Sequence, residues 1–181
     1  MTTTLFTNAH IATGEPGSTA ASTLPLQDIL VTDGVFTAFG PGLAQQYEAQ
    51  GGDLAAIEVV DLGGKLVCPP FCDTHLHLDY VFTARKPGAV NESGTLFEGI
   101  QRWSETKSDL TVDEIKQRAK IGIKKEMLHG VQLIRSHADV TDPNLTSLKA
   151  LLELKEELKD TVTLQIVSFP QEGMYSYEGP H

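Results

Sequence analysis

Strand-like and helix-like segments alternate through residues 66–181, and this alternation constrains the fold more than any other feature of the sequence. Apolar runs typical of strands alternate with segments whose apolar residues have helical spacing, in the order 66–78, 95–103, 111–128, 131–140, 142–158 and 161–170. Thr111 to Glu114 has the pattern of a helix-capping box, and Gly130 is placed to end the same helix. Strands connected through helices pair in parallel, with right-handed crossovers. The sequence therefore predicts an α/β fold with a parallel sheet.

Polar residues follow each of the three strands predicted in this region. In parallel α/β folds, functional residues gather at the carboxyl ends of the strands. The residues at these ends are His75 and His77, then His137 and Asp139, then Gln171 and Glu172. We therefore expect the three strands to bring these side chains to one edge of the sheet.

The pair His75 and His77 is the strongest candidate for a metal site. Side chains two residues apart in an extended chain lie on the same face, so the two imidazoles are expected to converge. Two neutral imidazoles at that separation bind one transition metal, and they are compatible with zinc, iron or manganese. An H-x-H pattern alone also arises by chance, so the prediction depends on the neighbouring sequence.

Cys68 and Cys72 are the two cysteines of the chain, and both lie close to the histidine pair. Their spacing is not the C-x-x-C of zinc ribbons. Free cysteine commonly behaves as a small buried apolar residue, so we expect two buried thiols rather than metal ligands. Trp103 has helical spacing with its apolar neighbours and is expected in the core.

Residues 1–65 have a different pattern, with short strands and many turns. Strands are expected at 5–11 and 57–62, a hairpin at 28–40 with its turn at Asp33-Gly34, and a short helix at 43–48. This pattern predicts half of a small β-sandwich. We therefore divide the chain into a sandwich segment, 1–65, and an α/β segment, 66–181.

The charge and hydropathy of the chain exclude several partners. With 14 basic and 24 acidic residues, the formal net charge is −10, which disfavours nucleic acid and anionic membranes as partners. No apolar run approaches the ~18 residues of a membrane span, and the first residues lack the pattern of a signal peptide. We expect a cytoplasmic protein that binds a small molecule.

The α/β segment is too short for a closed barrel. A (β/α)8 barrel needs about 250 residues, whereas residues 66–181 hold three β/α units. Three parallel strands alone would leave two sheet edges exposed to aggregation. We therefore expect the sequence to be the N-terminal part of a larger enzyme, completed by the rest of the barrel or by association with a second copy.

Four segments give the chain a resemblance to the amidohydrolase superfamily and, within it, to the bacterial cytosine deaminase group. The H-x-H-x-D pattern within Val67 to Asp79 is similar to the superfamily signature. More specific are S-G-T-L-F-E-G-I at Ser93 to Ile100, R-S-H-A-D-V from Arg135 to Val140, and the segment ending in F-P-Q-E-G at Gly173. The similarity extends from about residue 57 onward.

The resemblance implies a metal-dependent (β/α)8 TIM barrel flanked by a β-sandwich, with one divalent metal ion, which is zinc, iron or manganese. It also implies hydrolytic deamination of a heterocycle, with cytosine converted to uracil and ammonia. His75 and His77 match the first two metal ligands, Gln171 matches the amide that binds the polar edge of the pyrimidine, and Leu96 and Phe169 match the apolar walls of the pocket. For His137 and Asp139, two roles stay open: orienting a metal ligand through a hydrogen bond, or ordinary hydrogen bonding at the strand ends.

The acid/base residues of that family have no counterpart in this chain. The family's H-x-x-E motif is absent, since Glu126 to His129 has the reverse order and belongs to an outer helix. No catalytic residue is therefore assigned here, and the isolated chain is expected to be inactive. Isocytosine, creatinine or a triazine are alternative substrates, and a non-catalytic binding or assembly module that uses its open sheet edge is an alternative function.

Overall fold

A computed structural model describes residues 2–12 and 24–174 of the chain. The contacts divide the chain into two compact units between Pro69 and Pro70, and each unit is described by itself. The end of the predicted α/β segment, residues 175–181, lies outside the described residues. In the described part of the chain, no helix has the length and apolar character needed to cross a membrane.

The first unit contains one five-stranded sheet with strand order β3-β2-β1-β4, and β5 also pairs with β1. Its elements are β1 (Thr3–Ile11), β2 (Leu26–Thr32), β3 (Val35–Gly40), α1 (Leu43–Ala49), the 3-10 helix η2 (Leu54–Ala56), β4 (Glu58–Asp61) and β5 (Leu66–Val67). Asp33 and Gly34 both have positive φ, 50° and 79°, as a two-residue hairpin turn requires. The hairpin predicted at 28–40 is thus confirmed.

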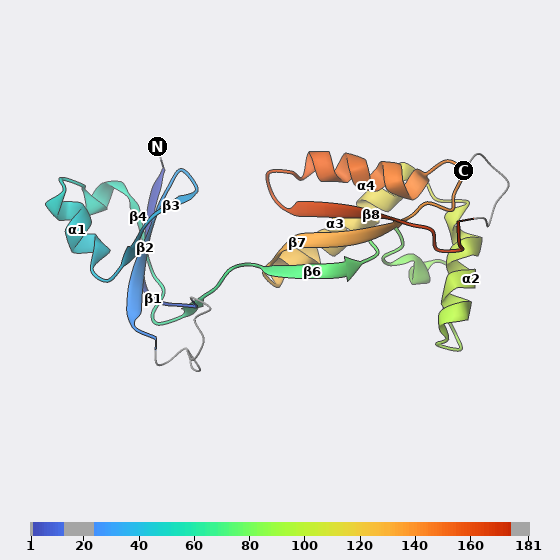
Figure 1. Ribbon diagram of the computed structural model, residues 1–181, viewed down its shortest axis with the longest axis horizontal. Helices are drawn as coiled ribbons and strands as arrows, with labels where there is room; N and C mark the ends of the chain where they lie inside the picture. Colours follow the sequence, from blue (N-terminus) through green and yellow to red (C-terminus); the bar gives the residue numbers. More distant parts are fainter. Residues whose placement is uncertain (1, 13–23, 175–181) are drawn as a thin grey trace. The chain divides into compact units, whose positions relative to one another are not determined.

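The second unit contains a parallel sheet with strand order β6-β7-β8. Its elements are β6 (Phe71–Leu76), the 3-10 helix η3 (Thr83–Arg85), α2 (Leu96–Lys107), α3 (Val112–Leu128), β7 (Val131–Asp139), α4 (Thr146–Glu157) and β8 (Thr163–Phe169). In Figure 1, α3 and α4 run along the sheet, whereas α2 lies beyond the arrowheads that mark the carboxyl ends of the strands. The predicted α/β fold class is confirmed.

The first strand of the parallel sheet is shorter than predicted. Leu66 and Val67 pair with β1 in the first unit, and the parallel strand begins only at Phe71. The two intervening prolines have no backbone N–H, so they cannot continue a hydrogen-bonded ladder from one strand into the other.

The helix ends follow local side-chain chemistry. The capping box is present at the start of α3, where Thr111 accepts from the amide of Glu114 and the Glu114 carboxylate accepts from the amide of Thr111. Helix α4, in contrast, begins at Thr146 and not at residue 142 as predicted. Leu145 has a φ of 53°, outside the helical region, and the Asp142 carboxylate accepts hydrogen bonds from the amides of Asn144 and Thr146. The aspartate therefore stabilises a turn before the helix.

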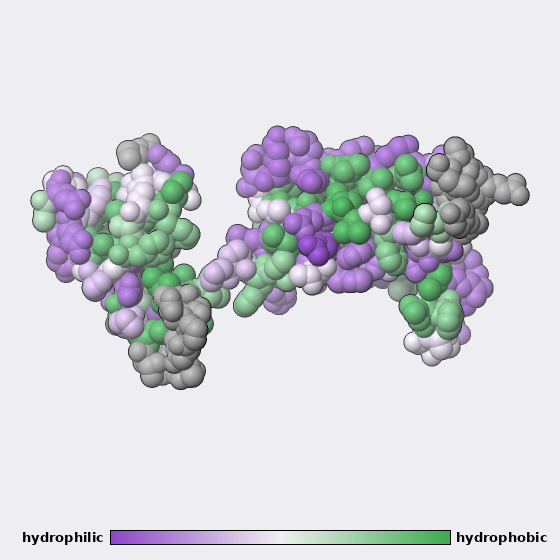
Figure 2. Space-filling view, viewed as in Figure 1, coloured by the Kyte–Doolittle hydropathy of each residue, from purple (hydrophilic) through white to green (hydrophobic). Residues whose placement is uncertain are grey.

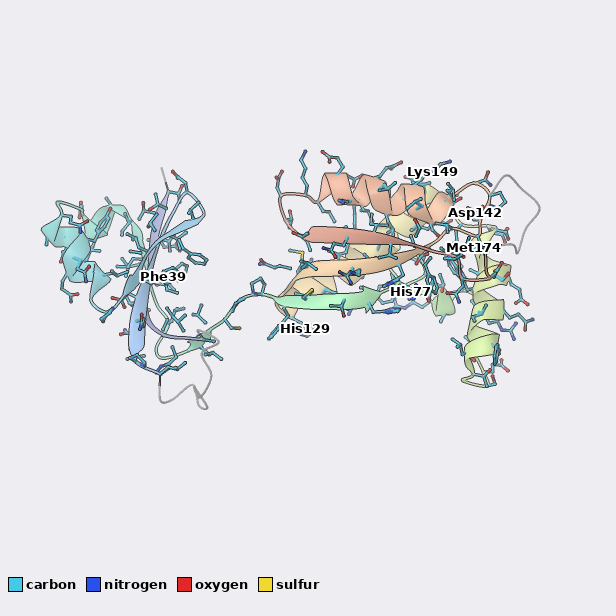
Figure 3. The ribbon with its side chains drawn as sticks, viewed as in Figure 1. Phe39, His77, His129, Asp142, Lys149 and Met174 are labelled. Atoms are coloured by element: carbon cyan, nitrogen blue, oxygen red, sulfur yellow. The ribbon has the colours of Figure 1, made fainter. Side chains whose placement is uncertain are left out.

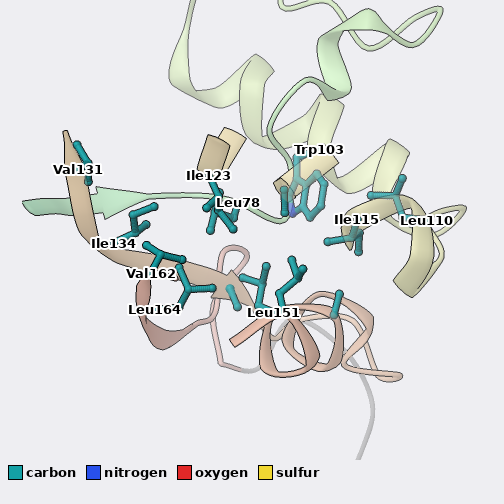
Figure 4. Packing of buried hydrophobic residues seen from close by; sticks show 14 residues of the cluster. Leu78, Trp103, Leu110, Ile115, Ile123, Val131, Ile134, Leu151, Val162 and Leu164 are labelled. Atoms are coloured by element: carbon teal, nitrogen blue, oxygen red, sulfur yellow. The ribbon is translucent and has the colours of Figure 1, made fainter. Parts of the chain in front are cut away.

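The core of the second unit lies between its sheet and helices α3 and α4. Ile134, Leu151 and Ile115 are almost completely buried, and Leu78 joins them from the segment that follows β6 (Figure 4). Trp103 is 5% exposed, which confirms its predicted place in the core. In Figure 2, hydrophilic residues lie along the upper edge of α4, whereas hydrophobic residues show below them.

Candidate metal and substrate site

The two histidines of the H-x-H motif lie where β6 ends. His75 is within the strand and His77 follows it, with their ring centroids 5.3 Å apart. Figure 3 shows His77 at the end of β6, with His129 at the opposite end of the sheet. Leu78 then turns into the core, where its amide donates to the Ser136 hydroxyl at 3.0 Å. Burial of Leu78 therefore fixes the chain directly after the histidine pair.

The His77 ring is held in one orientation and one tautomer. Its Nδ1 lies 3.1 Å from the carbonyl oxygen of His137, and because a carbonyl only accepts, Nδ1 donates. In the neutral ring, Nε2 then carries the free electron pair that a metal requires. Burial is the main cause that lowers the pKa of His77, which keeps the ring neutral at physiological pH. Tyr80 stacks on the ring, with centroids 4.6 Å apart.

His137 joins the pair from the neighbouring strand β7. Its ring stacks on His75 with centroids 4.1 Å apart and an angle of 21° between the planes. Among the residues that the structure describes, no three or more His, Cys, Asp or Glu side chains form a group able to hold a metal ion. The donor set of His75 and His77 fits two positions of a divalent transition metal site, and further ligands have to come from other residues.

Asp139 is a buried junction of hydrogen bonds at the end of β7. Its carboxylate accepts from Trp103 Nε1 at 2.7 Å, from Lys107 Nζ at 3.1 Å, and from both the amide and the hydroxyl of Thr141. Burial opposes ionisation, but these donors outweigh it and lower the pKa of Asp139. The contacts of this side chain are thus with α2 and the strand end, not with a histidine ring.

Asp79 is a second buried carboxylate near the end of β7, where it binds the backbone of Asp139. It is fully buried, and its Oδ2 accepts from the amide of Asp139 at 2.8 Å. Burial raises the pKa of Asp79 to about 6. Arg118 on α3 donates to the carbonyl oxygens of Asp79 and Val81, and so braces the loop after the histidine pair.

One cavity of about 620 Å³ opens at the carboxyl ends of the strands. It is lined by all five residues predicted to contact metal or substrate: His75, His77, Leu96, Phe169 and Gln171. The remaining wall comes from the segment between Tyr80 and Thr95 and from one face of α2. Leu96 remains 73% exposed although it lines the cavity. The fold therefore gathers residues that are separated by more than ninety positions in the sequence.

The loop that forms one side of the cavity is anchored by Glu98. Its carboxylate accepts from the amide of Glu92 at 3.1 Å and from that of Ser93 at 2.7 Å. Hydrogen bonds from Ser93, together with that from Glu92, lower the pKa of Glu98 to about 2. Thr95 caps α2 by accepting from the amide of Glu98. The G-T-L-F-E-G segment thus fixes both the cavity wall and the start of α2.

The two cysteines do not belong to this arrangement. Cys68 and Cys72 are both exposed and free, so the prediction of buried thiols is wrong. Cys72 is near the start of β6, which in the described part of the chain is an edge strand with a neighbouring strand on one side only. Neither residue lines the cavity.

Sequence reasoning missed two residues with central positions, Lys107 and Tyr80. Lys107 lies four residues after Trp103 in α2, so the two share a helix face. This helical spacing was the only feature of the sequence that pointed to Lys107. It does not identify the carboxylates to which Trp103 and Lys107 donate hydrogen bonds. Tyr80 carried no signal beyond its closeness to the histidine pair.

Comparisons with known proteins agree with this architecture. Residues 58–180 match the model of the Amidohydrolase family. A crystal structure of 5-methylcytosine deaminase from Klebsiella pneumoniae superposes with a TM-score of 0.78 and 40% sequence identity, covering 96% of this chain and 38% of that one.

Two curated proteins are also similar. N-isopropylammelide isopropyl amidohydrolase from Pseudomonas sp. is 35% identical over 120 residues, covering 64% of this chain and 30% of that protein. Pterin deaminase from Rhizobium rhizogenes is 27% identical over 152 residues, covering 81% of this chain and 32% of that protein. The chain thus spans about a third of the length of the curated relatives it matches. The model of the Amidohydrolase family matches most of the length of this chain, so the chain belongs to the amidohydrolase family.

Proposed function

We propose that this chain forms part of a metal-dependent hydrolase that deaminates a small nitrogen heterocycle, with cytosine or a close analogue as substrate and uracil and ammonia as the products from cytosine. The observation that carries the proposal is that His75, His77 and Gln171 line one cavity. Similarity to a 5-methylcytosine deaminase and to a pterin deaminase supports a heterocyclic substrate.

In this proposal, His75 and His77 are two ligands of one divalent ion, zinc, iron or manganese. The hydrogen bond from His77 Nδ1 to the carbonyl of His137 presents Nε2 to the cavity, and the stacked His137 ring restricts the orientation of His75. When bound, the ion would supply Lewis acidity that makes water a competent nucleophile near neutral pH.

The substrate contacts come from three other residues. The side-chain amide of Gln171 both donates and accepts, which matches the alternating donors and acceptors on the edge of an aminopyrimidine. Leu96 and Phe169 supply apolar surfaces against which a flat ring can pack. Asp139 acts indirectly, by fixing α2 against the strand ends.

A triazine is the second candidate substrate. It is favoured by the 35% identity to N-isopropylammelide isopropyl amidohydrolase. A triazine offers a similar flat ring and a similar edge of donors and acceptors, so the residues described above would serve both substrates. Isocytosine and creatinine are further candidate substrates, and the ammonia-release assay described below includes both.

The proposal is tested with the complete protein that contains this chain. Elemental analysis is expected to find one divalent metal ion per protein, and an ammonia-release assay is expected to show turnover of cytosine, isocytosine, creatinine or an aminotriazine. Metal-loaded protein that releases no ammonia from any of them would contradict the proposal and favour a binding or assembly role.

The assignment of the ligands has its own test. Replacing both His75 and His77 by Ala is expected to remove bound metal and turnover together, because two of the metal's ligands are lost. His129→Ala is the matched control, since His129 lies at the opposite end of the sheet (Figure 3). Stoichiometric metal in the double variant would refute the assignment.

A further inference from the structure

Lys107 makes an unusual set of contacts for a lysine at the end of a helix. The ammonium group lies 3.1 Å from Asp139 Oδ2, 2.7 Å from Thr141 Oγ1 and 2.8 Å from Glu172 Oε1. An ammonium has three N–H donors, so each of them has an acceptor. The side chain is only 12% exposed. Lys107 therefore joins three elements: helix α2, the end of β7 and the loop that follows β8.

The charges around Lys107 make this contact difficult to replace. The side chain of Asp139 is 1% exposed and that of Glu172 is 25% exposed, so the lysine lies between one fully buried and one partly buried carboxylate. Removing one partner of a buried ion pair strongly destabilises the folded protein, because the remaining charge is buried without water and without its counter-ion. Without the ammonium group, the two negatively charged carboxylates repel each other, so Glu172 is expected to move away from Asp139.

Glu172 is adjacent to Gln171 in a tight turn after β8. The turn is closed by a hydrogen bond of 3.0 Å from the amide of Gly173 to the carbonyl of Pro170. Glu172 is thus the point at which the turn that carries Gln171 is attached to α2. The same helix carries Leu96 on the cavity wall, and Trp103 attaches the helix to Asp139 a second time.

We infer that Lys107 is a positioning residue for the substrate: through Glu172 it holds Gln171 at a fixed distance from the α2 wall of the cavity. The inference rests on the proposed function for the role of Gln171, whereas the anchoring of the turn rests on the contacts alone. Lys107 itself does not line the cavity. Loss of the anchor is therefore expected to weaken substrate binding and to leave the metal site intact.

The chain offers a matched control in Lys116. This lysine of α3 is 14% exposed, close to the 12% of Lys107, and it also pairs with two carboxylates, Glu153 and Glu157, which are more exposed than Asp139 and Glu172. Its contacts, however, join α3 to α4 and involve no residue of the cavity. A purely structural role for Lys107 predicts that Lys107→Met and Lys116→Met behave alike.

The first experiment measures kinetics in the complete, metal-loaded protein. Lys107→Met is expected to raise KM about tenfold, because the charge-assisted hydrogen bond to Glu172 that anchors the Gln171 turn is lost, with kcat and metal content changed less than about twofold. Glu172→Gln is expected to raise KM in the same direction, and the double variant to be no worse than Lys107→Met alone. Lys116→Met is expected to keep the KM of the parent protein. An unchanged KM in Lys107→Met would overturn the inference.

The second experiment separates this inference from the proposed function. Amide hydrogen exchange of Gly173 is measured in the complete protein without substrate, where no turnover is needed. Exchange is expected to accelerate in Lys107→Met and to stay unchanged in Lys116→Met. If the parent protein turns over no heterocycle, the proposed function fails, and the exchange result alone decides whether Lys107 anchors the turn. Equal exchange in the two variants would refute the anchor.

Discussion

Gln171 is the residue on which substrate recognition depends in the proposed function. It lines the same cavity as the histidine pair but contributes no metal ligand. Gln171→Ala is expected to raise KM by about tenfold to a hundredfold, because a buried polar edge of the substrate loses its partner, while the metal content stays unchanged. Steady-state kinetics with parallel elemental analysis checks this prediction.

The control for Gln171 is Gln101→Ala. Gln101 is exposed on α2, and its side chain donates to Glu105. The KM of Gln101→Ala is expected to equal that of the parent protein. Loss of metal in Gln171→Ala would show that the residue supports the metal site instead.

Glu98 gives the cavity loop a defined dependence on pH. Its pKa is lowered from 4.5 to about 2 by the hydrogen bonds from Ser93 and Glu92. Because the folded-state pKa lies below the unfolded one, the stabilisation is present above pH 4.5 and is lost as the pH falls toward about 2. The NMR signal of the Ser93 amide is therefore expected to stay constant as the pH falls through 4.5 and to move only at lower pH.

Glu98→Gln is the matched variant for this titration. It keeps the shape of the side chain but removes the charge, so the shift of the Ser93 amide signal at low pH is expected to disappear. A titration midpoint close to 4.5 in the parent protein would show that Glu98 is not held by these amides.

At the scale of the element, helix α3 depends on the capping box formed by Thr111 and Glu114. Thr111→Ala is expected to lower the free energy of unfolding by about 1 kcal/mol, because an amide of the first turn loses its acceptor. Thr111→Ser retains the hydroxyl and is expected to restore most of the loss. Chemical denaturation followed by circular dichroism measures both, and equal stability of all three proteins would contradict the importance of the cap.

At the scale of the whole molecule, the described residues supply two imidazoles to the proposed metal site and no third ligand. Two imidazoles alone bind a divalent ion weakly, since stable sites use three or four protein ligands. The isolated 181-residue chain is therefore expected to lose metal on equilibrium dialysis and to release no ammonia from cytosine. Tight stoichiometric binding of zinc by this chain would contradict the prediction.

The sequence by itself determined the order of strands and helices and the position of the candidate site residues at the carboxyl ends of the strands. Periodicity, the capping box at Thr111 and the Asp33-Gly34 turn act within a few residues, so they can be read directly from the sequence. The rule that parallel strands present function at their carboxyl ends then placed His75, His77 and Gln171 together, and one cavity contains them. The start of β6 and of α4 could not be predicted, because they depend on which strand pairs with Leu66 and on the turn that Asp142 stabilises.

Only the tertiary structure decided what surrounds these residues. Lys107 meets Glu172 across 65 positions of the sequence, and Trp103 meets Asp139 across 36. The stacking of His137 on His75 and the raised pKa of Asp79 likewise depend on how the strands and α2 are packed. The exposure of Cys72 follows from the edge position of β6. No local pattern carries this information, because burial and pairing are set by the placement of whole elements and not by spacing along one of them.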